Sequence, residues 1–175
     1  NTTSRVAHRL WHDVIKSSDY LIDLHSAAKG RINMPQVRAN LADPPSNIVA
    51  KAFGIEVILD SIPPKGSLRR VAMKEGIGCM TYEGGGADNI DHESTQVAVN
   101  GVLNVLKSLH VIPGNPTRPR FRLLARGSTW LRAGEGGLLD MWVGPSSVVE
   151  EGEIVATISD PAHPGLTVDI IAPGD

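Results

Sequence analysis

Strand-like and helix-like stretches alternate along the first two thirds of this 175-residue chain, and this alternation constrains the fold more than any other feature. Apolar residues recur at helical spacing over 4–17 and 93–109, which predicts two amphipathic helices. Runs of consecutive β-prone apolar residues at 20–24, 55–59 and 77–82 predict buried strands. The sequence therefore predicts an α/β fold, with a mostly parallel or mixed sheet flanked by helices.

Shorter helices and one long loop are predicted to connect these elements. A helix over 47–53 is expected to end at Gly54, and a second helix is expected to begin after Ser67, because glycine and serine are typical residues at helix ends. The segment Gly30 to Pro45 contains three prolines and few apolar runs. This composition predicts a long irregular loop after the first strand.

The composition of the chain changes at Ile112. Residues 113–119 include three prolines, and the short β-prone runs that follow are separated by Gly, Pro and Asp turns. We therefore expect an α/β domain at 1–112, a linker at 113–119 and a small all-β domain at 120–175. The strands expected in the small domain are 121–125, 138–143, 154–158 and 166–171. Because the chain stops at a turn signal, we expect this domain to be incomplete at its C-terminus.

Charge, hydropathy and cysteine content exclude several classes of partner. The formal net charge is −2, and Arg118, Arg120, Arg122 and Arg126 are too sparse to follow a phosphate backbone, so nucleic acid is not expected. No apolar stretch approaches the roughly 18 residues that span a bilayer, so no membrane partner is expected. The single cysteine, Cys79, lies in an apolar run and cannot form an internal disulfide. It is expected in the core, and a cytoplasmic location is expected for the protein.

Two chemically active side chains come at the ends of two predicted strands. His25 ends the first strand, and Glu83 follows the third strand and precedes Gly84 to Gly86. Ligands of α/β sheets bind at the carboxyl ends of the strands. An imidazole and a carboxylate that meet there indicate a hydrolytic site. Asp23, just before the histidine, is expected to point to the opposite face of its strand.

Short motifs along the chain resemble one known family. The first four motifs are Tyr20-Leu-Ile-Asp-Leu-His-Ser, Gly30-Arg-Ile-Asn, Gly66-Ser-Leu-Arg and Tyr82-Glu-Gly-Gly. Two more, Ala133-Gly-Glu-Gly-Gly-Leu and Val149-Glu-Glu-Gly-Glu, occur in the expected β-domain. Taken in this order, they resemble the succinylglutamate desuccinylase/aspartoacylase family of zinc-dependent deacylases, relatives of the zinc carboxypeptidases. The resemblance covers nearly the whole chain and implies a zinc-carboxypeptidase-like fold for 1–112.

The resemblance implies a role for three residues. His25 would be a zinc ligand, Glu83 the catalytic carboxylate and Arg69 a residue that faces the substrate. The other two protein ligands of the family come from a His-x-x-Glu motif, and no such pair precedes His25. We therefore expect the chain to be a fragment that lacks this N-terminal segment, the alternative being a homologue whose metal site has decayed.

The implied activity is hydrolysis of the amide bond of a small N-acyl amino acid or N-acyl amine. Zinc, the implied cofactor, lowers the pKa of a bound water, and a carboxylate such as Glu83 can act as general base. The expected partner is a small N-acylated substrate, and the formation of a homo-oligomer is left open. Two alternatives remain: a non-catalytic homologue that acts as a binding or scaffold module, and a carboxypeptidase-type peptidase.

Each candidate residue also has a structural interpretation. By residue type alone, His25 would more often be a hydrogen-bonded structural histidine. Glu83 could cap a loop, and Arg69 could form a surface salt bridge. Arg31 and Asn33 could be either loop hydrogen-bonding residues or pocket residues.

Overall fold

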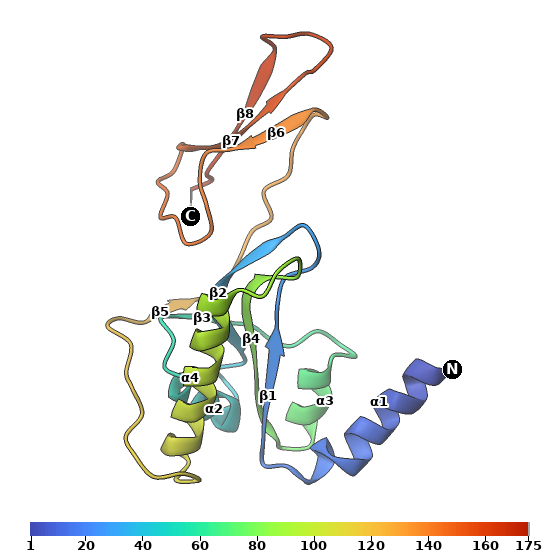
Figure 1. Cartoon of the computed structure of the whole chain (residues 1–175), viewed down its shortest axis with the longest axis vertical. Helices are drawn as coiled ribbons and strands as arrows, with labels where there is room; N and C mark the ends of the chain where they lie inside the picture. Colours follow the sequence, from blue (N-terminus) through green and yellow to red (C-terminus); the bar gives the residue numbers. More distant parts are fainter. Residues whose placement is uncertain (175) are drawn as a thin grey trace. The chain divides into compact units, whose positions relative to one another are not determined.

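A five-stranded mixed sheet organises the first of the two units into which the chain divides, residues 1–127 (Figure 1). The computed structural model describes residues 1–174. The strands are β1 (Tyr20–His25), β2 (Ile32–Ala39), β3 (Val57–Asp60), β4 (Gly78–Gly86) and β5 (Leu123–Ala125), in the order β1-β4-β2-β3-β5. Only the β2–β4 pairing is antiparallel. The predicted α/β class, with a mixed sheet and flanking helices, is confirmed.

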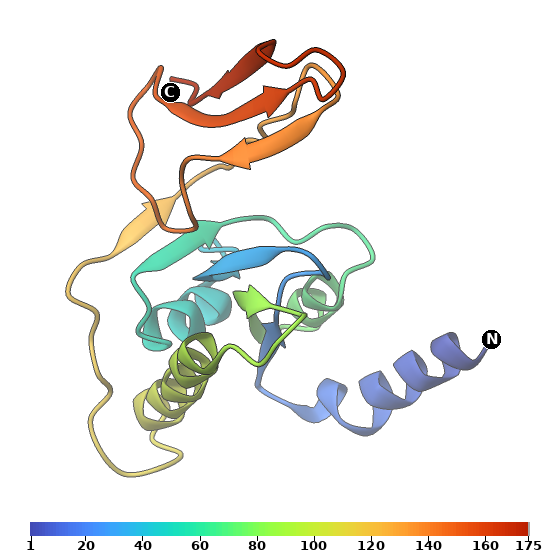
Figure 2. The same cartoon turned by 45° about the horizontal axis from the view of Figure 1, so that its top comes forward.

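Helices cover both faces of this sheet. They are α2 (Pro44–Ala52), α3 (Leu68–Lys74) and α4 (His92–Ser108). The first helix, α1 (Thr2–Asp13), has no buried residue and extends away from the sheet (Figure 1), and a short 3-10 helix, η1 (Ile15–Ser17), follows it. Helices α2 and α4 lie together on one face (Figure 2), over a core that includes Phe53, Ile58, Met80 and Tyr82. On the other face, α3 packs against Cys79, whose predicted place in the core is confirmed.

The prediction of an irregular loop over 30–45 is wrong, because this segment contains the strand β2. Pro35 lies where the register between β2 and β4 shifts, a place where the missing N–H of proline breaks no regular ladder bond. Pro44 and Pro45 open α2, where the first amides have no helical partner. The prolines therefore lie at a bulge and at the start of a helix. Composition alone does not distinguish these positions from a loop, so it predicted a loop.

The first unit extends further along the chain than the sequence predicted. Leu123–Ala125, expected in the small β-domain, pairs in parallel with β3 instead. The segment expected as a linker is tied to α4, because the Asn104 side chain donates to the carbonyl of Thr117 and accepts from its amide. The sequence of a three-residue strand does not indicate which sheet the strand joins. Long-range contacts such as these therefore set the boundary between the two units.

From Ser128 onward, a second unit forms a three-stranded antiparallel sheet. Its strands are β6 (Leu138–Met141), β7 (Ile154–Ser159) and β8 (Thr167–Ile171), in the order β6-β7-β8. The small all-β part of the fold class is confirmed. Within residues 1–174, every helix is too short or too polar to span a bilayer.

Asn104 supplies a first test of this packing. Its side chain is buried, donates to the carbonyls of Phe53 and Thr117 at 3.2 Å each, and accepts from the Thr117 amide at 2.8 Å. We expect Asn104→Ala to lower the free energy of unfolding by about 2–4 kcal/mol, because backbone groups lose their partners. Asn100→Ala, on the exposed side of the same helix, should cost less than about 0.5 kcal/mol. Equal losses in chemical denaturation would contradict the assignment.

Tyr82 supplies a second test, through pH. Burial raises the pKa of Tyr82, the negative charge of Asp91 raises it further, and the hydrogen bond to the Ser94 carbonyl at 2.8 Å opposes this rise. The unfolded chain therefore ionises first as the pH rises through about 10, and the folded state loses stability in that range. Tyr82→Phe should flatten the fall in unfolding free energy between about pH 9 and 11. Tyr20→Phe should keep that fall, and identical profiles for the two variants would contradict the account.

Candidate active site

The face of the sheet that carries α3 is apolar at one end and polar at the other. Leu21 of β1 packs in the same small core as Cys79 of β4, under α3. Further along the strands, side chains of the same face are polar, because side chains alternate between the two faces. These are Asp23 and His25 of β1 and Thr81 and Glu83 of β4. The part of this face beyond α3, toward the carboxyl ends of β1 and β4, is therefore polar.

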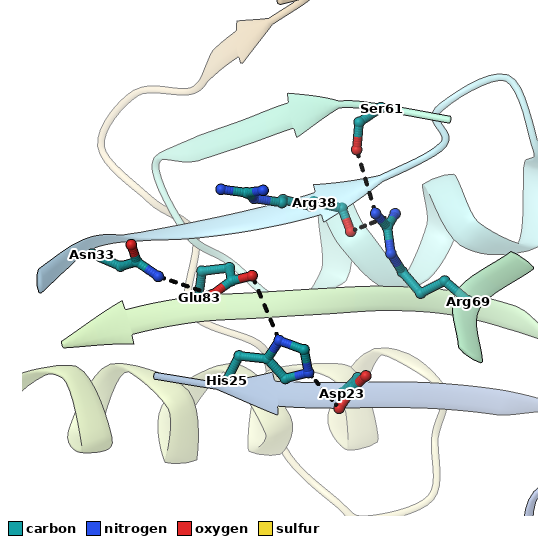
Figure 3. Close-up of polar contacts among 7 residues, drawn as sticks. All are labelled: Asp23, His25, Asn33, Arg38, Ser61, Arg69 and Glu83. Carbon is teal, nitrogen blue, oxygen red and sulfur yellow. Dashed lines mark hydrogen bonds and ion pairs between the residues drawn. The ribbon is translucent and has the colours of Figure 1, made fainter. Parts of the chain in front are cut away.

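His25 and Glu83 meet in this area. The parallel register of β1 and β4 places them opposite each other, and Nδ1 of His25 lies 3.6 Å from Oε1 of Glu83 (Figure 3). The Glu83 side chain is 15% exposed and that of His25 is 48% exposed. The strand β4 continues to Gly86, so the carboxylate belongs to the strand itself. The expected convergence of one imidazole and one carboxylate from neighbouring strands is found.

Asn33 of β2 holds the second oxygen of this carboxylate. Its Nδ2 donates to Oε2 of Glu83 at 2.9 Å. The sequence left Asn33 between a loop residue and a pocket residue, and the strand β2 brings it to the site. The hydrogen bond fixes the orientation of the Glu83 carboxylate, with Oε1 on the side of His25 (Figure 3).

Asp23 lies on the same face of β1 as His25, so the expectation that it points to the opposite face is wrong. Oδ1 of Asp23 is 3.1 Å from Nε2 of His25. Residues two apart on a strand share a face, and this period alone would have found the contact. The imidazole therefore has a carboxylate next to each of its two nitrogens.

Arg69 reaches the main chain of β2 from α3. Nη1 donates to the carbonyl of Arg38 at 3.2 Å, and Nη2 donates to Oγ of Ser61 at 3.5 Å (Figure 3). Arg69 is 8% exposed, and within residues 1–174 it forms no ion pair. The alternative interpretation of Arg69, as a residue in a surface salt bridge, therefore does not apply. Burial lowers the pKa of Arg69 and the positive charge of Arg38 lowers it further, while nearby negative charges, those of Asp23 and Glu83 among them, oppose this. The guanidinium stays protonated at neutral pH.

The donor set at this site fits one position of a zinc site. Residues 1–174 contain no group of three His, Cys, Asp or Glu side chains placed to hold a metal ion. His25 has the chemistry of a zinc ligand, because it offers a half-exposed imidazole nitrogen beside a carboxylate. The described part of the chain thus supplies one nitrogen ligand, and the other ligands of a zinc site would have to come from other groups.

An open groove borders His25 on the face that carries α2 and α4. It is lined by Leu24, Tyr82 and residues of the segment between β4 and α4. Neither Glu83 nor Arg69 lines it. His25 lines the groove as well, so the groove reaches the polar cluster at this residue.

Comparison with known proteins identifies the family and the fold. Residues 1–109 match the family model of the succinylglutamate desuccinylase/aspartoacylase catalytic domain. No curated protein sequence matches the chain. A succinylglutamate desuccinylase/aspartoacylase from Rhodobacter sphaeroides has 23% sequence identity and a TM-score of 0.83, and the match covers 98% of this chain and 55% of that one.

Two further solved structures are similar. The product-bound ectoine utilization protein EutE (DoeB) from Ruegeria pomeroyi has 20% identity and a TM-score of 0.85, with 98% of this chain and 56% of that chain covered. A succinylglutamate desuccinylase from Silicibacter sp. TM1040 has 23% identity and a TM-score of 0.80, with 97% and 55% covered.

The chain spans about half the length of these solved structures. At such identities the structural similarity establishes the fold alone. The family model, however, matches 109 of 175 residues, which is more than half of the chain. It also includes the strands that carry His25 and Glu83. The chain therefore belongs to the succinylglutamate desuccinylase/aspartoacylase family.

Proposed function

We propose that this chain acts in a zinc-dependent deacylase that hydrolyses the amide bond of a small N-acyl amino acid or N-acyl amine. The observation that carries the proposal is the pairing of His25 with Glu83 across β1 and β4, with 3.6 Å between imidazole and carboxylate. The family to which the chain belongs consists of deacylases, which supports hydrolysis as the reaction class.

In this proposal His25 is one of the zinc ligands. Zinc supplies an activated water and polarises the amide carbonyl of the substrate. Asp23 holds the imidazole at Nε2, which orients the ring, and Nδ1 then faces Glu83. A carboxylate that orients a ligating histidine in this way is a common arrangement in metal sites.

Glu83 is the proposed general base and acid. Its Oε1 takes a proton from the attacking water and delivers it to the leaving nitrogen, because an amine leaves readily only after protonation. Asn33 keeps Oε2 occupied by a hydrogen bond. One carboxylate, held in one orientation, therefore serves both proton transfers.

Arg69 is the proposed substrate-facing residue. Its hydrogen bonds to the main chain of β2 and to Ser61 hold the guanidinium in place, and no carboxylate within residues 1–174 neutralises it by an ion pair. A planar guanidinium that is held rigidly suits the carboxylate of an N-acyl amino acid or a developing oxyanion.

One observation favours a different function, that of a non-catalytic binding module. Residues 1–174 do not bring three metal-binding side chains together. A homologue with a decayed metal site would look the same in this part of the chain. Two experiments on the full-length gene product separate these functions.

The first experiment removes the proposed base. Glu83→Gln keeps the size of the side chain and can still accept from Asn33, but an amide cannot take a proton. We expect kcat to fall by about 10²–10⁴-fold, with little change in KM, in an assay of amine release from N-acetyl and N-succinyl amino acids. Glu75→Gln, at the exposed end of α3, is the matched control and should keep wild-type activity. A fully active Glu83→Gln variant would refute the assignment.

The second experiment measures metal content. We expect about one zinc per chain in the wild type and a large loss of zinc in His25→Ala, because one nitrogen ligand is removed. His12→Ala, which removes an exposed histidine of α1, should leave the zinc content unchanged. A wild type that holds no zinc and releases no amine would favour the non-catalytic module.

A further inference from the structure

Two histidines lie side by side on the surface of α1. His8 and His12 are one helical turn apart, their ring centres are separated by 4.2 Å, and the ring planes are tilted by 47°. Both side chains are exposed, and α1 contains no buried residue. Residues four apart lie on the same side of a helix, so the backbone itself brings the two imidazoles together. The helix carries no residue of the candidate active site, and the deacylation proposed above does not use this pair.

The separation of the two rings fits two ligands of one metal ion. Nitrogen–metal distances of about 2.0–2.1 Å place the centres of two neighbouring imidazole ligands about 4–5 Å apart. The observed 4.2 Å lies in this range. Because the rings are tilted and exposed, small rotations of the side chains are enough to direct one nitrogen of each ring toward a common ion.

No carboxylate engages these imidazoles. Within residues 1–174, neither His8 nor His12 forms an ion pair. Asp13, the one acidic residue of α1, is bound instead by Arg9, with 2.7 Å between Nε and Oδ2. A metal ion at the pair would therefore be held by the nitrogens alone, with water in its other positions.

The surroundings of the pair select the kind of ion. Arg5 lies three residues before His8, and Lys16 lies four residues after His12, so the nearby charges are mostly positive. Mg²⁺ and Ca²⁺ require oxygen ligands, above all carboxylates, and gain nothing here. Late first-row ions bind imidazole strongly, and their affinity rises from Co²⁺ through Ni²⁺ to Cu²⁺. The pair therefore suits Ni²⁺ and Cu²⁺.

We propose that His8 and His12 form a second metal site, a two-nitrogen chelate for late first-row divalent ions such as Ni²⁺ and Cu²⁺. The site is separate from the zinc position proposed at His25 and does not rest on the deacylase function. Two protein ligands hold an ion less firmly than the three or four of a resident zinc site, so this metal exchanges and is lost on dialysis. The zinc content described above thus counts the position at His25 alone.

A bound ion would also stabilise the exposed part of α1. Trp11 packs against the small core that contains Ile15, which anchors the end of the helix, while the earlier turns extend away from the sheet (Figure 1). A helix of this length without packing is only marginally stable in water. An ion held by His8 and His12 joins an unanchored turn to the anchored one. Because the chelate exists only in the helical state, binding favours that state.

Calorimetric titration with Ni²⁺ tests the site, on the zinc-loaded, full-length gene product without a histidine tag. We expect His8→Gln and His12→Gln each to weaken Ni²⁺ binding at least about tenfold, because a second ligand on the same helix acts at a high effective concentration. His110→Gln, which removes an exposed histidine after α4, should keep the affinity. A wild type that binds no Ni²⁺, or binding that survives both substitutions in α1, would overturn the proposal.

A variant with altered spacing separates chelation from the mere number of histidines. His12→Ala combined with Thr3→His keeps two imidazoles on exposed positions of α1 but places them five residues apart, about 140° around the helix axis. It should bind Ni²⁺ as weakly as His12→Gln. Wild-type affinity in this double variant would contradict the chelate. Mg²⁺ should give no heat with any of these proteins, and Mg²⁺ binding that depends on His8 would contradict the assignment to nitrogen ligands.

Electron paramagnetic resonance with Cu²⁺ counts the nitrogens directly. The measurement is made in the His25→Ala background, so that copper does not enter the position proposed for zinc. We expect the nitrogen hyperfine pattern of two imidazoles, and the pattern of one after His12→Gln is added. A role of the pair in folding alone would not change this count. Identical patterns with and without His12 would overturn the proposal.

Failure of this inference can be told apart from failure of the proposed function. Ni²⁺ binding that depends on His8 and His12, in a protein that releases no amine from N-acyl amino acids, would refute the deacylase and support the second metal site. Deacylation by a protein whose Ni²⁺ binding is unchanged in His8→Gln and His12→Gln would refute the second site alone.

Discussion

The parallel register between β1 and β4 is the constraint on which the site depends. It places His25 opposite Glu83 and Asp23 opposite Thr81 on a single face of the sheet. A shift of one residue in either strand would turn these side chains into the core under α2 and α4. Apolar residues of the same strands, such as Met80 and Tyr82, fill that core and so hold the register. The packing of one face therefore positions the chemistry of the other.

The negative and the positive charges of the site lie in different places. The two carboxylates stand on β1 and β4, next to the two nitrogens of His25. The guanidinium groups of Arg38 and Arg69 stand on the β2 side (Figure 3), where Arg69 is anchored by the main chain of Arg38. Within residues 1–174 no ion pair joins the carboxylates to these guanidinium groups, so the two sets of charges do not neutralise each other.

The sequence predicted the elements whose signals are local. The cap of α3 at Ser67, the strands with continuous apolar residues, and the meeting of His25 with Glu83 all follow from short patterns. The strand β2 was missed because its proline sits at a bulge, where a strand tolerates proline. The sequence therefore left Asn33 open between a loop residue and a pocket residue and did not name Arg38, since both come to the site on β2. The boundary after Gly127 was missed because pairing of β5 with β3 is a long-range contact.

The central claim is that His25 binds a zinc ion beside which Glu83 acts as the base. Zinc-edge anomalous diffraction from crystals of the full-length gene product tests it most directly. The account predicts an anomalous peak at about 2.0–2.1 Å from a ring nitrogen of His25, with Glu83 next to the metal and not bound to it. A zinc ion bound elsewhere in the protein, with His25 and Glu83 free of it, would contradict the account.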